Sequence, residues 1–262
     1  MNIRLDGRTA LVCGSSKGIG KAIALQFAEI GADVILLARS EDLLKDLLAK
    51  LPRNSGQNHS YIVGNTSKPE WLVWEVNNKI EEYGAIHILV NNSGGPPSGL
   101  ASEASEEEYL SGFTNHVITS NKFVRALLPG MKQAGYGRII NIISVGLKQP
   151  IENLGVSNTI RGAMGSWAKT LSRELGIFGI TVNNILPGQT DTERLMALIK
   201  LNAAREGKSI EEKIDEMKSE IPLRRFAHPE ETAFAAAFLA SEFASFINGI
   251  SLPVDGGFLR GI

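Results

Sequence analysis

The sequence predicts an α/β fold: a single doubly wound domain over residues 1–262, with a seven-stranded, mainly parallel sheet and helices on both faces. Short β-branched and aliphatic runs alternate along the chain with longer stretches that carry apolar residues at helical spacing. Runs that are apolar at nearly every position, such as 34–37, are typical of parallel strands covered on both faces. No Ser/Gly-rich linker or shift of composition divides the chain, which favours one domain.

The predicted elements follow one another as βαβ units. The strands are 9–13, 34–37, 61–63, 86–90, 138–143, 180–186 and 250–254. The helices between them have apolar residues at helical spacing, as with Ile19, Ile23 and Phe27 in the first. They cover 18–30, 41–50, 69–83, 106–134, 154–178 and 229–243.

The strand rhythm stops between Pro187 and Pro229. Two charged, amphipathic segments, 192–201 and 209–219, predict a helical insertion at about residues 190–220. Because it follows the carboxyl end of a strand, this insertion is expected beside the ligand crevice, where it can act as a lid. A plain surface hairpin of helices is the alternative.

A glycine-rich loop joins the first strand to the first helix. Glycines at this junction allow a tight turn and close approach of the backbone to a pyrophosphate at the helix N-terminus. The sequence therefore predicts a dinucleotide-binding loop. Its residues are Gly14, Ser15, Ser16, Lys17, Gly18, Ile19 and Gly20.

The end of the second strand indicates which dinucleotide is bound. Where an NAD site would carry an acidic residue for the ribose 2′-hydroxyl, the chain has Ala38 followed by Arg39. Arg39 and Lys17 can pair with a 2′-phosphate, so NADP is favoured over NAD. The alternative is that Arg39 lies at the sheet edge without a ligand and Lys17 is merely solvated.

The composition excludes several other functions. Lys and Arg number 27 against 28 Asp and Glu, a formal charge of −1, so neither a nucleic acid nor a membrane partner is expected. No apolar run approaches the length of a membrane-spanning helix. Cys13 is the single cysteine and the first residues do not resemble a signal peptide, so a cytoplasmic location is expected. No cluster has metal-ligand spacing, so no metal site is expected.

Several motifs, in order along the whole chain, resemble those of the short-chain dehydrogenase/reductase family, and most of all its 3-oxoacyl-acyl-carrier-protein reductase branch. They are the Gly14-Gly18-Gly20 loop, Asn91-Asn92-Ser93-Gly94, Pro187-Gly188 and the closing Val254-Asp255-Gly256-Gly257. The resemblance implies a Rossmann-type fold, a nicotinamide-dependent carbonyl/alcohol oxidoreductase, and a homotetramer or homodimer. It also implies further cofactor contacts, at Asn65, Asn92, Ser93, Gly94, Arg161, Pro187, Gly188 and Thr190.

The chain departs from the family in its catalytic residues. The family uses an Asn, a Ser and a Tyr-xxx-Lys pair, and only the Ser has its counterpart, at Ser144. By ungapped counting, Ser157 stands at the Tyr position and Arg161 at the Lys position. The Asn position falls on His116, and a shift of one residue would place Asn115 there.

These replacements change how a proton can be supplied. Ser157 is too short for direct donation, and Arg161 stays charged, so its role is binding and electrostatics. The proton would come from a water held by Ser144, Ser157 and Arg161, which we favour, or from His116, since an imidazole titrates near neutrality. His116 can also be an ordinary helix residue that faces a neighbour or solvent.

The sequence therefore predicts an NADP-dependent short-chain oxidoreductase that reduces a carbonyl, of 3-oxoacyl type or another ketone, to an alcohol with atypical catalytic residues. The substrate would be a small molecule or an acyl thioester, and the loop over 94–99 would shape its pocket. The alternative is a catalytically inert NADP-binding sensor or scaffold, which the lost Tyr favours.

Overall fold

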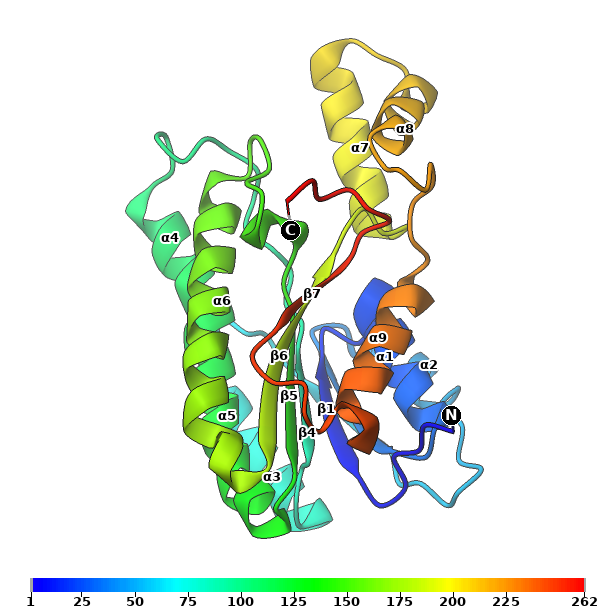
Figure 1. Cartoon of the computed structure of the whole chain (residues 1–262), viewed down its shortest axis with the longest axis vertical. Coiled ribbons are helices and arrows are strands. Elements are labelled where there is room, and N and C mark those ends of the chain that lie inside the picture. The colour runs from blue at the N-terminus through cyan, green and yellow to red at the C-terminus, as the bar shows by residue number, and fades with distance from the viewer. Residues whose placement is uncertain (1, 262) are drawn as a thin grey trace.

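A computed structural model describes residues 2–261 and contains one seven-stranded sheet in the order β3-β2-β1-β4-β5-β6-β7 (Figure 1). Every neighbouring pair is parallel, so the sheet is entirely and not just mainly parallel. All strand ends lie within about two residues of the prediction, a normal uncertainty for element boundaries. The strands are β1 Thr9–Cys13, β2 Asp33–Ala38, β3 Ser60–Val63, β4 Ile88–Asn91, β5 Gly137–Ile142, β6 Ile180–Pro187 and β7 Ser251–Val254.

Helices cover both faces of the sheet (Figure 1). One face carries α1 Gly18–Glu29, α2 Glu41–Leu48 and α9 Pro229–Ala240, which bury the first apolar core. The other carries α3 Pro69–Tyr83, α5 Thr119–Ala134 and α6 Gly155–Leu175, which bury the second. The continuous apolar strands are explained by this burial on both sides.

The predicted helix over 106–134 is not one α-helix. It consists of α4 Glu106–Phe113, a π-helical turn η1 Thr114–Ile118, and α5. At the turn, the hydroxyl of Thr119 donates to the carbonyl oxygen of Thr114 at 2.9 Å and lies 2.8 Å from that of Thr66. Single π turns inside α-helices are often found at functional sites, and this one carries His116.

Buried asparagines connect four neighbouring strands. Asn91 donates to Asn141 and Asn141 to Asn184, each at 2.9 Å, and Asn184 donates to Ser251 at 3.1 Å. Each of these polar side chains is thus paired inside the sheet, where an unpaired one would destabilise the fold. These side-chain hydrogen bonds connect β4, β5, β6 and β7 close to the carboxyl end of β4.

The insertion forms two helices, α7 Glu193–Glu206 and α8 Ile210–Ser219, that project beyond the carboxyl edge of the sheet (Figure 1). Thr192 caps α7, and Ser209 with Glu212 forms a capping box on α8, which explains where both helices begin. No helix within residues 2–261 is long and apolar enough to cross a membrane.

Candidate active site

A cleft of about 860 Å³ lies at the carboxyl edge of the sheet. The glycine loop, the end of β2, the loop after β4 and the first turn of α7 line it. In an open parallel sheet this edge is where ligands bind, because the loops after the strands meet there. The first turn of α7, and no residue of α8, belongs to the lining.

The glycine loop has the backbone geometry that its glycines were expected to allow. Gly14 and Gly18 have φ angles of 61° and 53°, in the left-handed region that favours glycine. A β-carbon at Gly14 would lie 2.5 Å from the carbonyl oxygen of Asn92. No side chain caps α1, so its first N–H groups face the cleft without a side-chain partner.

The two cations expected at the 2′-phosphate differ in their surroundings. Arg39 is exposed, lines the cleft, and has no carboxylate within 4 Å among residues 2–261. Lys17 instead forms an ion pair with Glu193, Nζ to Oε2 at 2.5 Å, so the alternative of a merely solvated lysine does not hold. This pair joins the glycine loop to α7 across the cleft mouth.

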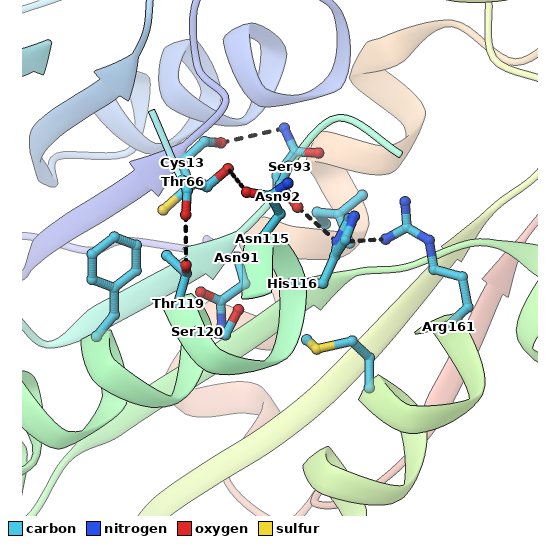
Figure 2. A pocket seen from close by; sticks show the side chains of 13 residues that line it. Cys13, Thr66, Asn91, Asn92, Ser93, Asn115, His116, Thr119, Ser120 and Arg161 are labelled. Atoms are coloured by element: carbon cyan, nitrogen blue, oxygen red, sulfur yellow. Dashed lines mark hydrogen bonds between the residues drawn. The ribbon is translucent and has the colours of Figure 1, made fainter. Parts of the chain in front are cut away.

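A second, smaller pocket of about 10 Å³ opens beside the cleft (Figure 2). This volume holds about one water molecule. The two cavities share four lining residues, Thr66, Asn92, Ser93 and Asn115. The pocket is also lined by the polar side chains of His116 and Arg161 and by the apolar side chains of Phe123, Ile142 and Met164.

His116 is buried in the π turn, with 3% of its surface exposed. Its Nδ1 lies 2.7 Å from the hydroxyl oxygen of Ser93 (Figure 2). Burial, and then the positive charge of Arg161, lower the pKa of His116 to about 3. The expectation that this imidazole titrates near neutrality is therefore wrong, because its cationic form would be desolvated beside another cation.

Arg161 lies one helical turn after Ser157 on the buried face of α6, as their four-residue separation requires. Its guanidinium points toward His116, with Nη1 3.5 Å from Nδ1 (Figure 2). Its Nε is buried without a hydrogen-bond partner. Burial and the charge of Arg194 lower the pKa of Arg161 to about 10, which leaves it a cation at neutral pH.

The two serines expected at the reaction centre line neither of these cavities. The hydroxyl oxygen of Ser144 accepts a hydrogen bond from the backbone N–H of Gly146 at 3.0 Å. Ser157 is buried, with 8% of its surface exposed. The small pocket places a water-sized space beside Ser93, His116 and Arg161, and the water expected between Ser144, Ser157 and Arg161 stays a prediction.

Most residues expected to contact the cofactor line the large cleft. They are Gly14, Ser16, Lys17, Gly18, Ile19, Arg39, Asn65, Asn92, Ser93 and Gly94. Others do not line it, namely Ser15, Gly20, Arg161, Pro187, Gly188 and Thr190. Ser15 binds Leu37 through both its N–H and its hydroxyl, so it ties the loop to β2. Gly20 instead allows α1 to pack closely, since a β-carbon there would lie 2.6 Å from Asn92 Nδ2.

The sequence reasoning missed Arg194, which lines the cleft in the first turn of α7. A cation at this end of a helix is disfavoured by the helix dipole, and that was a signal in the sequence. It also missed Thr66, which joins both cavities and carried no motif. Across residues 2–261, no three His, Cys, Asp or Glu side chains lie where they could share a metal ion.

Comparisons with known proteins cover nearly the whole chain. A family model described as Enoyl-(Acyl carrier protein) reductase matches residues 14–259. The chain is 35% identical over 262 residues to the 3-oxoacyl-(acyl-carrier-protein) reductase FabG of Chlamydia muridarum, across 98% of this chain and 99% of that protein. It is 32% identical over 263 residues to the NADPH-dependent reductase BacG of Bacillus subtilis, across 98% and 100%. Among solved structures, L-sorbose reductase from Gluconobacter frateurii complexed with NADPH and L-sorbose has a TM-score of 0.93 and 32% identity, with both chains covered completely.

Proposed function

The chain belongs to the short-chain dehydrogenase/reductase family, and from that premise we propose that it is an NADP-dependent reductase of a carbonyl compound. The observation that carries this proposal is the glycine loop beside a cleft large enough for a dinucleotide, with Arg39 in the lining of that cleft. The family membership agrees with the resemblance found in the sequence. The relatives that are named NADPH-dependent or complexed with NADPH support the choice of cofactor.

The residues of the cleft fit a dinucleotide. The uncapped N–H groups of α1 suit a pyrophosphate, and close approach to the loop is possible because Gly14 and Gly18 have no side chains. Asn65, Asn92, Ser93 and Gly94 line the continuation of the same cleft toward the small pocket, where the nicotinamide ribose would be held. Arg161 would contribute its positive charge to that end.

The 2′-phosphate would bind at Arg39. The guanidinium is exposed and follows Ala38, whose methyl group offers no carboxylate to repel an anion. Lys17 could assist only by leaving Glu193, with which it is paired. Arg39 is therefore proposed as the main determinant of NADP binding.

NADPH, when bound, supplies the hydride, and the protein must position the carbonyl and provide a proton. The small pocket has the size and the polar lining to hold one water beside Arg161 and Ser93. That water is our proposed proton donor, because Ser157 is short and the pKa of His116 is too low. Ser144 would steady the carbonyl oxygen by donating its hydroxyl hydrogen. This hydrogen is free because the N–H of Gly146 bonds to the hydroxyl oxygen.

The substrate proposed is a 3-oxoacyl compound or another ketone, free or as an acyl thioester. Relatives named for 3-oxoacyl-(acyl-carrier-protein) reduction support the first, and the L-sorbose reductase supports a smaller polyhydroxy ketone. Gly94 and Gly95 line the cleft, which suits a role of this loop in shaping the substrate pocket.

A catalytically inert NADP-binding sensor or scaffold is the second candidate. The observation that favours it is Ser157, which lies at the position of the family's acid without a phenol to donate a proton. Both candidates require NADPH binding, so that measurement alone does not distinguish them.

The deciding experiment has two steps. Calorimetric titration should first give a dissociation constant for NADPH. NADPH oxidation is then followed at 340 nm with 3-oxoacyl thioesters, simple ketones and ketoses, and the reduced alcohol is identified. Turnover with any of them supports the reductase. Tight NADPH binding without turnover of any compound in the panel supports the sensor or scaffold.

A further inference from the structure

We propose that this site selects a carbonyl substrate that carries a carboxylate, and that Arg161 and Arg194 bind that carboxylate together. The inference rests on the proposed reductase function and adds the chemical class of its substrate. It assigns a role to Arg194, which the sequence reasoning left without one.

The two arginines approach the same residue from two different elements. Arg161 lies on α6 and Arg194 on α7, and both guanidiniums reach Gly95 in the loop after β4. A β-carbon on Gly95 would lie 2.5 Å from Nη2 of Arg194 and 3.3 Å from Nη2 of Arg161. The absence of a side chain at Gly95 is therefore what lets both guanidiniums pack against this loop.

The positive charge of this pair is not balanced by the protein. Within residues 2–261, neither arginine has a carboxylate within 4 Å, whereas Lys17 is paired with Glu193. Arg161 is 7% exposed, and its buried Nε has no hydrogen-bond partner. Burying an unpaired cation beside another cation is unfavourable, so the arrangement indicates an anion that binds there.

The position of Arg194 is also unfavourable for the helix that carries it. Thr192 is the N-cap of α7, which places Arg194 in the first turn, at the positive end of the helix dipole. Helix stability does not explain a cation there, whereas an anionic ligand at this end of α7 would interact favourably with both the arginine and the dipole.

The anion could be a substrate carboxylate or a phosphate of the cofactor. The glycine loop and Arg39 already provide for the phosphates of a dinucleotide, as argued above. Arg161, in contrast, lines the small pocket and not the large cleft, and Arg194 lines the large cleft next to Gly95. The pair thus lies where the two cavities adjoin, and a carboxylate is the planar group that two guanidinium forks bind best. We therefore assign the pair to the substrate.

The test measures binding to the NADP⁺-saturated protein, so it needs no turnover. The probes are pyruvate, acetoacetate and levulinate, each compared with its methyl ester by calorimetry or thermal shift. At least one acid should bind about 10-fold or more tightly than its ester, the typical effect of charged hydrogen bonds.

Arg194→Gln should reduce this preference to less than about threefold, and Arg194→Lys should restore part of it. NADPH affinity should stay within about threefold of the parent. Arg205→Gln, an exposed arginine later in the same helix, is the matched control and should change nothing.

Three results would overturn the inference: no acid binds, acids and esters bind equally in the parent protein, or Arg194→Gln weakens NADPH binding while the acid preference stays. The last would assign Arg194 to a cofactor phosphate. Failure of the proposed function is distinguishable, because it appears as absent NADPH binding or absent ketone reduction. A protein that binds NADPH and reduces neutral ketones without preferring acids would contradict the inference alone.

Discussion

Nδ1 of His116 accepts a hydrogen bond from Ser93, at 2.7 Å, and faces Nη1 of Arg161 at 3.5 Å. A guanidinium can only donate, so Nδ1 carries no proton and the neutral ring has its hydrogen on Nε2. The ring also has a hydrogen bond with the backbone of Gly94. His116 is thus a neutral group that positions Ser93 and Arg161, which leaves water as the favoured proton source.

The lowered pKa of His116 predicts a pH-dependent stability. Its pKa falls from 6.5 to about 3 on folding, so from pH 6.5 down to about 3 the unfolded chain binds a proton that the folded protein does not. Stability should fall with decreasing pH through this window, by about 1.4 kcal/mol per pH unit for one proton. In His116→Gln this contribution disappears and the decline becomes shallower, while His59 and His87 still contribute. Urea unfolding between pH 8 and 4.5 measures the slope, and identical slopes in parent and variant would contradict the assignment.

Cofactor preference should depend on Ala38 and Arg39. The parent is expected to bind NADPH more tightly than NADH, because Arg39 can pair with the 2′-phosphate. Replacing Ala38 by Asp together with Arg39→Ser should reverse the order, since a carboxylate repels the phosphate and accepts from a ribose hydroxyl. Calorimetric titration with both dinucleotides gives the ratio. Arg53→Ser changes an exposed arginine outside the cleft and serves as the control. Equal affinities in the parent would rule out a 2′-phosphate site at Arg39.

Restoring the family's catalytic pair should increase the rate. Ser157→Tyr with Arg161→Lys places a phenol one helical turn from an ammonium, which lowers the phenol pKa and supplies the general acid. We expect NADPH oxidation with a simple ketone to rise about 10²-fold, the typical contribution of such an acid. Ser157→Tyr alone, with Arg161 retained, controls for the loss of the guanidinium. An unchanged rate in a folded double variant that binds NADPH would show that the proton is not limiting.

Ser144→Ala should reduce whatever activity the parent has. The variant cannot donate a hydrogen bond to the substrate oxygen as negative charge develops there, which typically costs about 10²-fold or more in kcat. It also removes the acceptor for the N–H of Gly146, so thermal stability is measured beside kcat. Ser144→Thr keeps the hydroxyl and should recover part of the rate. A Ser144→Ala protein as active as the parent would exclude Ser144 from catalysis.

A two-fold symmetric oligomer is expected from the helical segments 106–134 and 154–178, which contain α4, α5 and α6 and resemble the surfaces through which family members pair. Leu110 and Phe113 on α4 are 59% and 41% exposed, an apolar surface available for a second copy. Sedimentation at micromolar concentration should show a dimer or tetramer, and Leu110→Glu should weaken it. Leu201→Glu introduces the same charge on the exposed face of α7 and should leave the assembly intact. A parent of only 28.3 kDa in solution would disprove the expectation.

The fold and the cofactor end of the site follow from local patterns in the sequence. Apolar runs with turns between them locate the strands, and the glycine spacing after β1 locates the dinucleotide loop, because both depend on neighbouring residues. The π turn at Thr114–Ile118 could not be found in this way. It is accompanied by a long-range contact, in which the hydroxyl of Thr119 lies beside the carbonyl of Thr66 from a distant loop.

The order of strands and helices, the glycine loop and the replacement of the family's Tyr and Lys by Ser157 and Arg161 could all be identified from the amino-acid sequence. The lowered pKa of His116, the pairing of Lys17 with Glu193 and the meeting of Arg161 and Arg194 at Gly95 became visible only in the folded chain. The physical reason is that protonation and ion pairing depend on burial and on charges within a few ångströms. At this site those charges come from chain segments far apart in the sequence, and they become neighbours only when the loops after β4 and β6 fold over the same edge of the sheet.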